Sequence, residues 1–186
     1  MHLLTVPGIH NSGPGHWQTR WEEVPGRVTR RFAPSSWDEP EAWDWVAAVE
    51  RDLSDLGPDT VVVAHSMGCL AAAHVAATVG GFRGLVLVAP PDIDGPNFPS
   101  DARRFGELKP GPLRVPGLLL TSSDDFYGEP EAYRRLAAAW NVPHLELGAL
   151  GHINAESELG MWDQGWQLVT AFVAGTRHGG TTSRNR

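Results

Sequence analysis

Six short apolar runs, each bounded by turn residues, limit the folds that this chain can adopt. They cover residues 3–6, 28–32, 61–64, 85–88, 117–120 and 144–147. Four of the runs are apolar over at least four residues, which is typical of strands buried on both faces of a parallel sheet. The second run, VTRRF, alternates apolar and polar residues more, so we expect it to form an edge strand.

Stretches with helical spacing lie between these runs. In one of them Trp45 and Val49 share an apolar stripe, and another begins with a proline, which is favoured in the first turn of a helix. The stretches cover residues 42–56, 69–79, 130–140 and 161–174. Because strands and helices alternate, the pattern predicts a three-layer α/β domain with a mostly parallel sheet of about six strands.

Two segments depart from this alternation. Residues 92–114 are rich in proline, glycine and charge, and we expect them to form a short cap or a mobile loop over the carboxyl edge of the sheet. Residues 176–186 have no apolar side chain, so we expect a disordered tail. The expected organisation is one α/β domain over residues 1–175, followed by this tail.

Composition argues against several classes of protein. The chain has 15 Lys and Arg against 22 Asp and Glu, and this net charge of −7 argues against a general nucleic-acid binder. The only cysteine, Cys69, can form neither an internal disulfide nor a cysteine-based zinc cluster. No apolar run approaches the roughly 20 residues of a membrane span, and MHLLTVPGIH does not resemble a signal peptide. We therefore expect a cytoplasmic protein with no nucleic-acid or membrane partner.

The sequence VVVAHSMGCLAAAHVAA, residues 61–77, carries the clearest chemical signal. An apolar run leads directly into Ala64, His65, Ser66, Met67 and Gly68, and an alanine-rich stretch follows. This is the strand–turn–helix context of the nucleophile elbow G-x-S-x-G, with alanine in place of the first glycine. The residues two before and two after the serine must be small, because larger side chains would collide with adjacent strands. The alternative is that the serine only caps an ordinary helix.

Two later segments supply the partners that a nucleophilic serine needs. A serine hydroxyl is activated by a base, and the base is oriented by a carboxylate. SSDDFYG places Asp124 and Asp125 directly after the fifth apolar run, and His152 follows the sixth. The order serine, acid, histidine is that of α/β-hydrolases. Taken singly, each aspartate fits a turn or a helix cap, and the histidine fits a loop without a catalytic task.

The chain resembles the small serine hydrolases of the α/β-hydrolase superfamily that include the retinoblastoma-binding protein 9-like and YdeN-like proteins. The resemblance extends to about residue 174 and depends on VPGIHNSGPGHWQTRWE, AHSMG, LVAPPD, SSDDFY and GHINAESELGMW. It implies an α/β-hydrolase fold in which Ser66 is the nucleophile, His152 is the base and Asp125 is the acid.

The choice between the two neighbouring aspartates stays open at this point. Family members carry a proline after the aspartate pair, where this chain has Phe126. Spacing favours Asp125 over Asp124, because the superfamily acid often stands three residues after a small residue at the strand end, and Ser122 fills that place.

The remaining candidates surround the serine. An oxyanion hole needs two N–H donors; we expect one from the backbone of Met67, and the resemblance implies a second from Ile9. His10 and Asn11 are candidates for substrate contact, and Trp162 is a candidate for the wall of an apolar acyl pocket. The chain has no G-x-G-x-x-G or G-x-x-x-x-G-K-[ST] sequence, which argues against nucleotide binding.

Together these features predict a serine hydrolase that cleaves small carboxylic esters, thioesters or amides through a Ser-His-Asp triad and an acyl-enzyme. We expect no cofactor, no metal ion and an accessible pocket that takes a small ester-like molecule. The alternative is a non-catalytic protein-interaction module on a hydrolase scaffold. The chain lacks the L-x-C-x-E sequence that binding to the retinoblastoma protein would require. The sequence leaves the oligomeric state and the choice between hydrolysis and acyl transfer open.

Overall fold

One parallel sheet forms the centre of the molecule. The computed structural model describes residues 1–176, in which six strands lie in the order β2-β1-β3-β4-β5-β6 and every adjacent pair is parallel. The strands are β1 (His2–Val6), β2 (Thr29–Arg31), β3 (Thr60–His65), β4 (Gly84–Val88), β5 (Gly117–Thr121) and β6 (His144–Glu146). The predicted α/β fold with a mostly parallel sheet of about six strands is confirmed.

Burial along the strands follows their position in the sheet. Every residue of the central strands β3 and β4 is buried, because both of their faces are covered. The edge strands β2 and β6 have no fully buried residue. The run VTRRF therefore forms an edge strand, as its alternation predicts.

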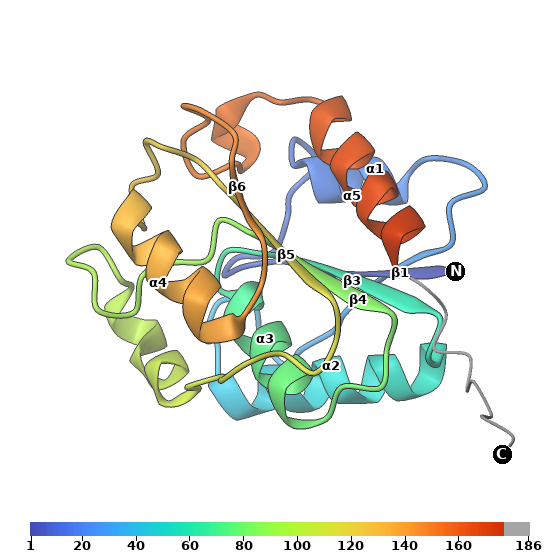
Figure 1. The fold of residues 1–186 in the computed structure, drawn as a ribbon, viewed down its shortest axis with the longest axis horizontal. Coiled ribbons are helices and arrows are strands. Elements are labelled where there is room, and N and C mark those ends of the chain that lie inside the picture. Colours follow the sequence, from blue (N-terminus) through green and yellow to red (C-terminus); the bar gives the residue numbers. More distant parts are fainter. Residues whose placement is uncertain (177–186) are drawn as a thin grey trace, which may run out of the picture.

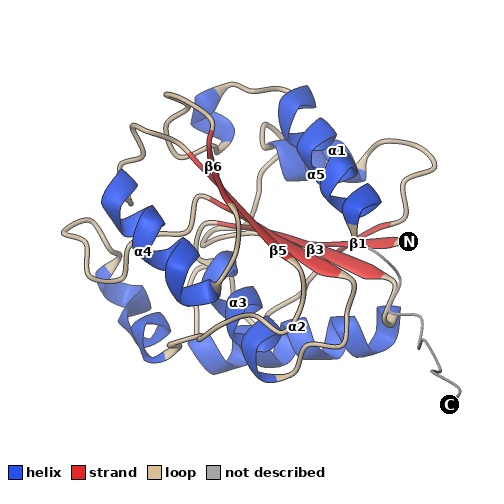
Figure 2. Ribbon diagram, in the orientation of Figure 1, coloured by secondary structure: helices blue, strands red, loops and turns tan. Residues whose placement is uncertain are grey.

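Helices cover both faces of the sheet, so the molecule has three layers (Figures 1 and 2). Two helices pack on one face and three on the other. The first face carries α1 (Trp17–Glu22) and α5 (Asp163–Gly175), and the second carries α2 (Ala42–Leu56), α3 (Gly68–Thr78) and α4 (Pro130–Trp140). No helix in residues 1–176 is long and apolar enough to cross a lipid bilayer.

Each face of the sheet has its own apolar core. Successive strand residues point to opposite faces, so Val61 and Val63 of β3 pack with Trp17 on the α1 and α5 side. Val62 and Ala64 belong to the core on the α2 and α3 side. A strand that feeds two cores in this way must be apolar at every position, which explains the continuous run VVVA.

The segment 92–114 is folded against the domain. It contains the 3-10 helix η1 (Ser100–Glu107), whose Ala102 and Phe105 are buried in the core. The ring of Phe105 lies 5.3 Å from that of Trp45 on α2. The expectation of a mobile loop is therefore wrong. The alternative of a short cap fits better, since Pro99 and Asp101 reach the cleft described below.

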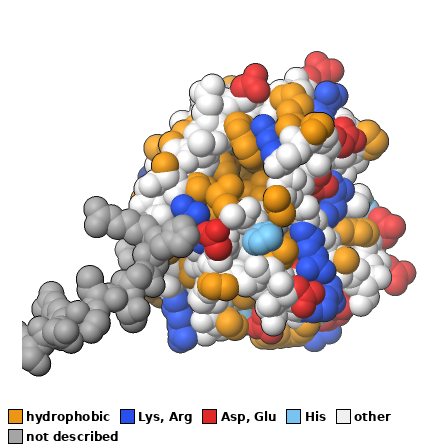
Figure 3. Space-filling model, turned by 90° about the vertical axis from the view of Figure 1, so that its right-hand side faces the viewer, with side chains coloured by type: hydrophobic (Ala, Val, Ile, Leu, Met, Phe, Trp, Pro, Cys, Tyr) orange, Lys and Arg blue, Asp and Glu red, His pale blue; other side chains and the backbone are white. Residues whose placement is uncertain are grey.

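The amino ends of the strands form the end of the molecule that faces the viewer in Figure 3, where acidic, basic and hydrophobic side chains are interspersed. Asp59 pairs there with the N-terminal amine and with Arg83, both at 2.9 Å. Thr176, expected to begin a disordered tail, is instead buried, and its hydroxyl accepts a hydrogen bond from Arg83. The rest of the expected tail lies outside the described residues.

Candidate active site

A strained turn between β3 and α3 presents the candidate nucleophile. Ser66 has a φ of 53°, in the left-handed region that a non-glycine residue adopts at a cost of about 1–3 kcal/mol. The turn is held because the Ser66 N–H donates to the carbonyl of Val88, at 2.9 Å. A Cβ added to Gly68 would collide with the carbonyl oxygens of Val6 and Pro7. The expectation that this position must be small is therefore confirmed.

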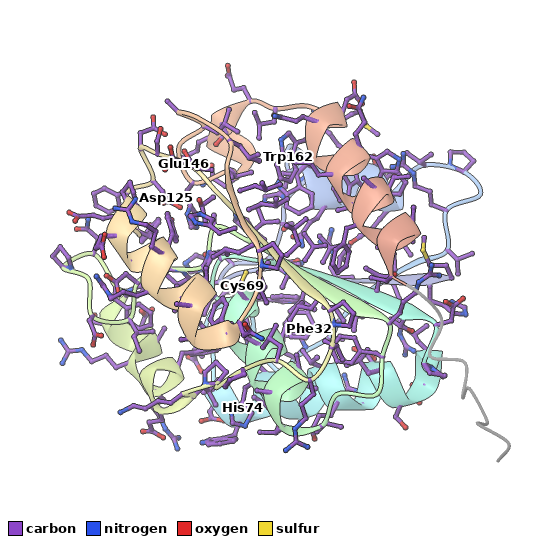
Figure 4. All side chains as sticks on the ribbon, viewed as in Figure 1. Phe32, Cys69, His74, Asp125, Glu146 and Trp162 are labelled. Atoms are coloured by element: carbon purple, nitrogen blue, oxygen red, sulfur yellow. The ribbon has the colours of Figure 1, made fainter. Side chains whose placement is uncertain are left out.

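The three residues predicted to form the triad are joined by hydrogen bonds. The His152 Nε2 lies 2.8 Å from the Ser66 Oγ, and its Nδ1 lies 2.9 and 3.0 Å from the two carboxylate oxygens of Asp125. Asp125 lies close to the start of α4 (Figure 4), and its side chain is fully buried, whereas that of His152 is 9% exposed. Since the carboxylate accepts from Nδ1–H, the lone pair of Nε2 faces the serine hydroxyl.

The neighbouring Asp124 has a different role in the structure. Its Oδ1 accepts hydrogen bonds from the Ser122 hydroxyl at 2.7 Å and from the Gly151 N–H at 2.8 Å. These bonds lower the pKa of Asp124, the Ser122 hydroxyl most of all. The structure therefore brings Asp125 to His152, and Asp124 holds the loop on which His152 is carried.

Two further histidines lie beside His152. The His65 Nε2–H donates to the carbonyl oxygen of His152 at 2.9 Å, and the ring of His16 lies 4.8 Å from that of His65. Burial lowers the pKa of His16 to about 3, with smaller contributions from Arg31 and His152. Burial also lowers the pKa of His65 well below its ordinary value. Both rings are therefore neutral near pH 7, and both line the cleft above the serine.

A cleft of about 460 Å³ opens directly above the serine. Its wall combines the loops after β1, β4, β5 and β6 with the nucleophile turn and the start of η1. The lining includes Gly8, Ile9, His10, Asn11, His16, His65, Met67, Pro99, Asp101, Tyr127, Asn154 and Glu156. Sequence reasoning missed Tyr127, whose ring lies 4.6 Å from that of His152. Its position in SSDDFYG, two residues after the acid, is the signal that could have identified it.

The two N–H groups expected to form an oxyanion hole border this cleft. Within residues 1–176 neither the Ile9 N–H nor the Met67 N–H donates to a protein group, whereas the next N–H of the loop, that of His10, donates to Trp37. Gly8 brings the loop close, since a Cβ there would lie 2.8 Å from the Ser66 Cβ. The glycine therefore allows a backbone approach that a side chain would block.

The predicted substrate contacts have different outcomes. His10 and Asn11 both line the cleft; the first is exposed and contacts Asp38, and the second accepts a hydrogen bond from Arg31. Trp162 does not line it. Its ring is buried near the start of α5 (Figure 4), 4.9 Å from that of Trp17 on α1. The expectation of an acyl-pocket wall at this position is wrong, because the side chain points into the core.

No group of three or more His, Cys, Asp or Glu in residues 1–176 is arranged to hold a metal ion. Cys69 is buried in the core, its Sγ–H donates to the carbonyl of Val88, and burial raises its pKa. The thiol is therefore a small core group.

Comparisons with known proteins identify the family of this chain. The sequence model of the serine hydrolase family matches residues 3–171. A YdeN-like hydrolase from Pectobacterium atrosepticum is 30% identical over 93% of this chain and 90% of its own, with a TM-score of 0.82. The YdeN protein of B. subtilis is 17% identical over 93% and 98% of the two chains, with a TM-score of 0.77.

A monoacylglycerol lipase from Paleococcus ferrophilus shares the fold at 16% identity over 93% and 94% of the two chains, with a TM-score of 0.70. The search of curated proteins gives no match to this chain. The resemblance to the YdeN-like proteins is thus confirmed by a family match over most of the sequence and by a solved relative. The chain belongs to the serine hydrolase family and is an enzyme of that type.

Proposed function

We propose that this enzyme hydrolyses small carboxylic esters, and related thioesters or amides, through Ser66, His152 and Asp125. The observation that carries the proposal is the hydrogen-bonded chain from the Ser66 Oγ through both ring nitrogens of His152 to Asp125, at the floor of an open cleft. A binding module has no physical need for such a chain. The geometry therefore favours catalysis over the protein-interaction alternative.

In the proposed reaction, the His152 Nε2 removes the proton of the Ser66 hydroxyl as its Oγ attacks the carbonyl carbon. Asp125 accepts the Nδ1–H hydrogen bond and stabilises the imidazolium that forms. The oxyanion of the tetrahedral intermediate lies against the unpaired N–H groups of Ile9 and Met67. His152 then protonates the leaving group. Water attacks the acyl-enzyme by the same steps, which releases the acid and restores the serine.

Charge in the cleft narrows the substrate class. Asp101 and Glu156 line it, and none of its described lining residues is Lys or Arg. A carboxylate or phosphate on the substrate would meet repulsion without a compensating cation. We therefore propose neutral or cationic esters as the better substrates. The short η1 segment leaves the cleft open, which argues against a lid of the kind that covers bulk lipid.

Covalent labelling with a fluorophosphonate tests the proposal. The wild-type enzyme should be labelled, whereas Ser66→Ala should not be labelled at all and His152→Ala only slowly, each with an unchanged far-ultraviolet circular dichroism spectrum. Labelling of Ser66→Ala would refute the assignment of the nucleophile. A folded wild-type protein that is neither labelled nor active on p-nitrophenyl esters would refute the proposed function and favour the interaction module.

A further inference from the structure

Asp125 accepts more hydrogen bonds than the orientation of His152 requires. Its Oδ1 accepts the backbone N–H of Tyr127 at 2.9 Å, and its Oδ2 accepts the hydroxyl of Tyr133 at 2.6 Å. The first bond comes from the same loop, two residues along the chain. The second comes from a side chain on α4 that lies outside every block on which the family resemblance depends.

The position of the Tyr133 hydroxyl is fixed by its surroundings. The ring is completely buried and lies against Gly128, where an added Cβ would be 2.6 Å from both the Cζ and the Oη of the tyrosine. The missing side chain of Gly128 therefore provides the space that the phenol occupies. Burial and the adjacent carboxylate also raise the pKa of Tyr133, so the phenol keeps its proton and remains a donor.

We propose that Tyr133 is a positioning residue of the triad, which fixes the Asp125 carboxylate and withdraws part of its negative charge from His152. The inference rests on the proposed function. Of the chain's two tyrosines, only Tyr133 donates its hydroxyl to the acid. A short hydrogen bond from a neutral hydroxyl to a carboxylate is stronger than a bond between two neutral groups, so it can hold one orientation of the carboxylate.

The negative charge of the Asp125 carboxylate determines in which direction the pH profile should move when the Tyr133 hydroxyl is removed. A carboxylate that loses one donor is more negative toward the imidazole, so the imidazole takes up its proton at a higher pH. Since His152 must be neutral to act as a base, the acid limb of the kcat/KM profile should move to higher pH when the hydroxyl is removed.

The other titratable groups near the pair are accounted for. Cys69, Asp92 and His144 face Tyr133, and His16, His65 and Tyr127 face His152. The Cys69 thiol and the rings of His16 and His65 are buried and neutral near pH 7, and burial also lowers the pKa of His144. Asp92 pairs with Arg135 at 3.3 Å. A shift on removal of the hydroxyl therefore originates at Asp125.

The test compares Tyr133→Phe with Trp140→Phe, which trims another buried aromatic side chain of α4. Trp140 packs in the apolar core and, within residues 1–176, neither lines the cleft nor donates to Asp125, so this variant controls for lost packing alone. For Tyr133→Phe we expect about a ten-fold lower kcat/KM at pH 7, the size of one hydrogen bond to a charged group. Its acid limb should also lie at a higher pH than those of the wild type and Trp140→Phe.

Gly128→Ala provides a second variant, because the added methyl group displaces the phenol from Asp125 without removing it. It should move the acid limb in the same direction, and it keeps the test decisive if Tyr133→Phe does not fold. If the folded variants have the same acid limb as the wild type, the inference is overturned. The proposed function still stands in that case, provided that the wild type is labelled by the fluorophosphonate. A wild type without labelling or activity would overturn both.

Discussion

The two buried neutral histidines beside the triad should make this fold less stable in acid. The pKa of His16 in the folded state is about 3, against about 6.5 in an unfolded chain. Between these values the unfolded state binds the proton and the folded state does not, so the free energy of unfolding falls as the pH decreases below 6.5. At about 1.36 kcal/mol per pH unit, His16 alone should remove about 2 kcal/mol between pH 7 and pH 5.

His65 contributes with the same sign, because burial also lowers its pKa. On acidification, proton uptake by the two side chains in the unfolded state therefore removes a large part of the roughly 5–15 kcal/mol that stabilises an ordinary domain. Above pH 6.5 both states carry neutral rings, so this contribution is constant and stability should level off.

The assay is urea unfolding followed by tryptophan fluorescence at pH 7 and pH 5, for the wild type and His16→Asn. Asparagine is a good N-cap residue, so it replaces the bond that the His16 Nδ1 accepts from the Gln18 N–H while removing the titrating group. The variant should lose about 2 kcal/mol less than the wild type between the two pH values. Equal losses in both proteins would refute the assignment of His16 as a buried neutral base.

Two further predictions concern the nucleophile turn and the acid. Gly68→Ala should cost about 3 kcal/mol, because the added Cβ meets backbone oxygens that cannot yield. This is a fall in Tm of roughly 6–12 °C, whereas Gly106→Ala, with no atom within 4 Å of the new Cβ, should leave Tm nearly unchanged. Equal Tm values for the two variants would contradict the argument. Asp125→Asn should lower kcat about 10³–10⁴-fold by disturbing the tautomer of the base, and Asp124→Asn less than ten-fold; steady-state ester hydrolysis at pH 7 separates them, and the reverse order would identify Asp124 as the acid.

Much of the fold is predictable because its strands and helices obey simple periodicities. Helices α2 and α4 begin and end where their apolar spacing indicates, at Ala42–Leu56 and Pro130–Trp140. Helices in the cores are packed by residues three and four apart, and that pattern is visible without any partner. The secondary structure of the segment 92–114 is less predictable from the sequence, since this segment buries only a few residues such as Ala102 and Phe105. A short 3-10 helix with a few apolar anchors does not differ in composition from a loop.

The candidate site was predictable only as far as chain order determines it. Strand ends place Ser66, an aspartate and His152 at one edge of the sheet, whatever the details of the loops. Spacing favours Asp125 over Asp124, but which of the two carboxylates reaches His152 depends on side-chain direction, which spacing alone does not determine. The prediction that Trp162 lines the acyl pocket is wrong for the same reason. Trp162 has a φ of 43° and stands one residue before α5, so its ring turns toward Trp17 rather than toward the cleft.

The loop that carries His152 is held from two sides by groups other than the acid. His65 donates to the carbonyl of His152, and Asp124 accepts the N–H of Gly151, the preceding residue. The backbone of the base is therefore fixed without Asp125. Positioning the base and stabilising its charge are two roles that a single carboxylate usually combines, and here different groups perform them. Replacing Asp125 by asparagine should change the tautomer and the charge beside the imidazole while its backbone stays in place. The large loss predicted for that variant is thus electrostatic in origin, and the smaller loss predicted for Asp124→Asn comes from the loop.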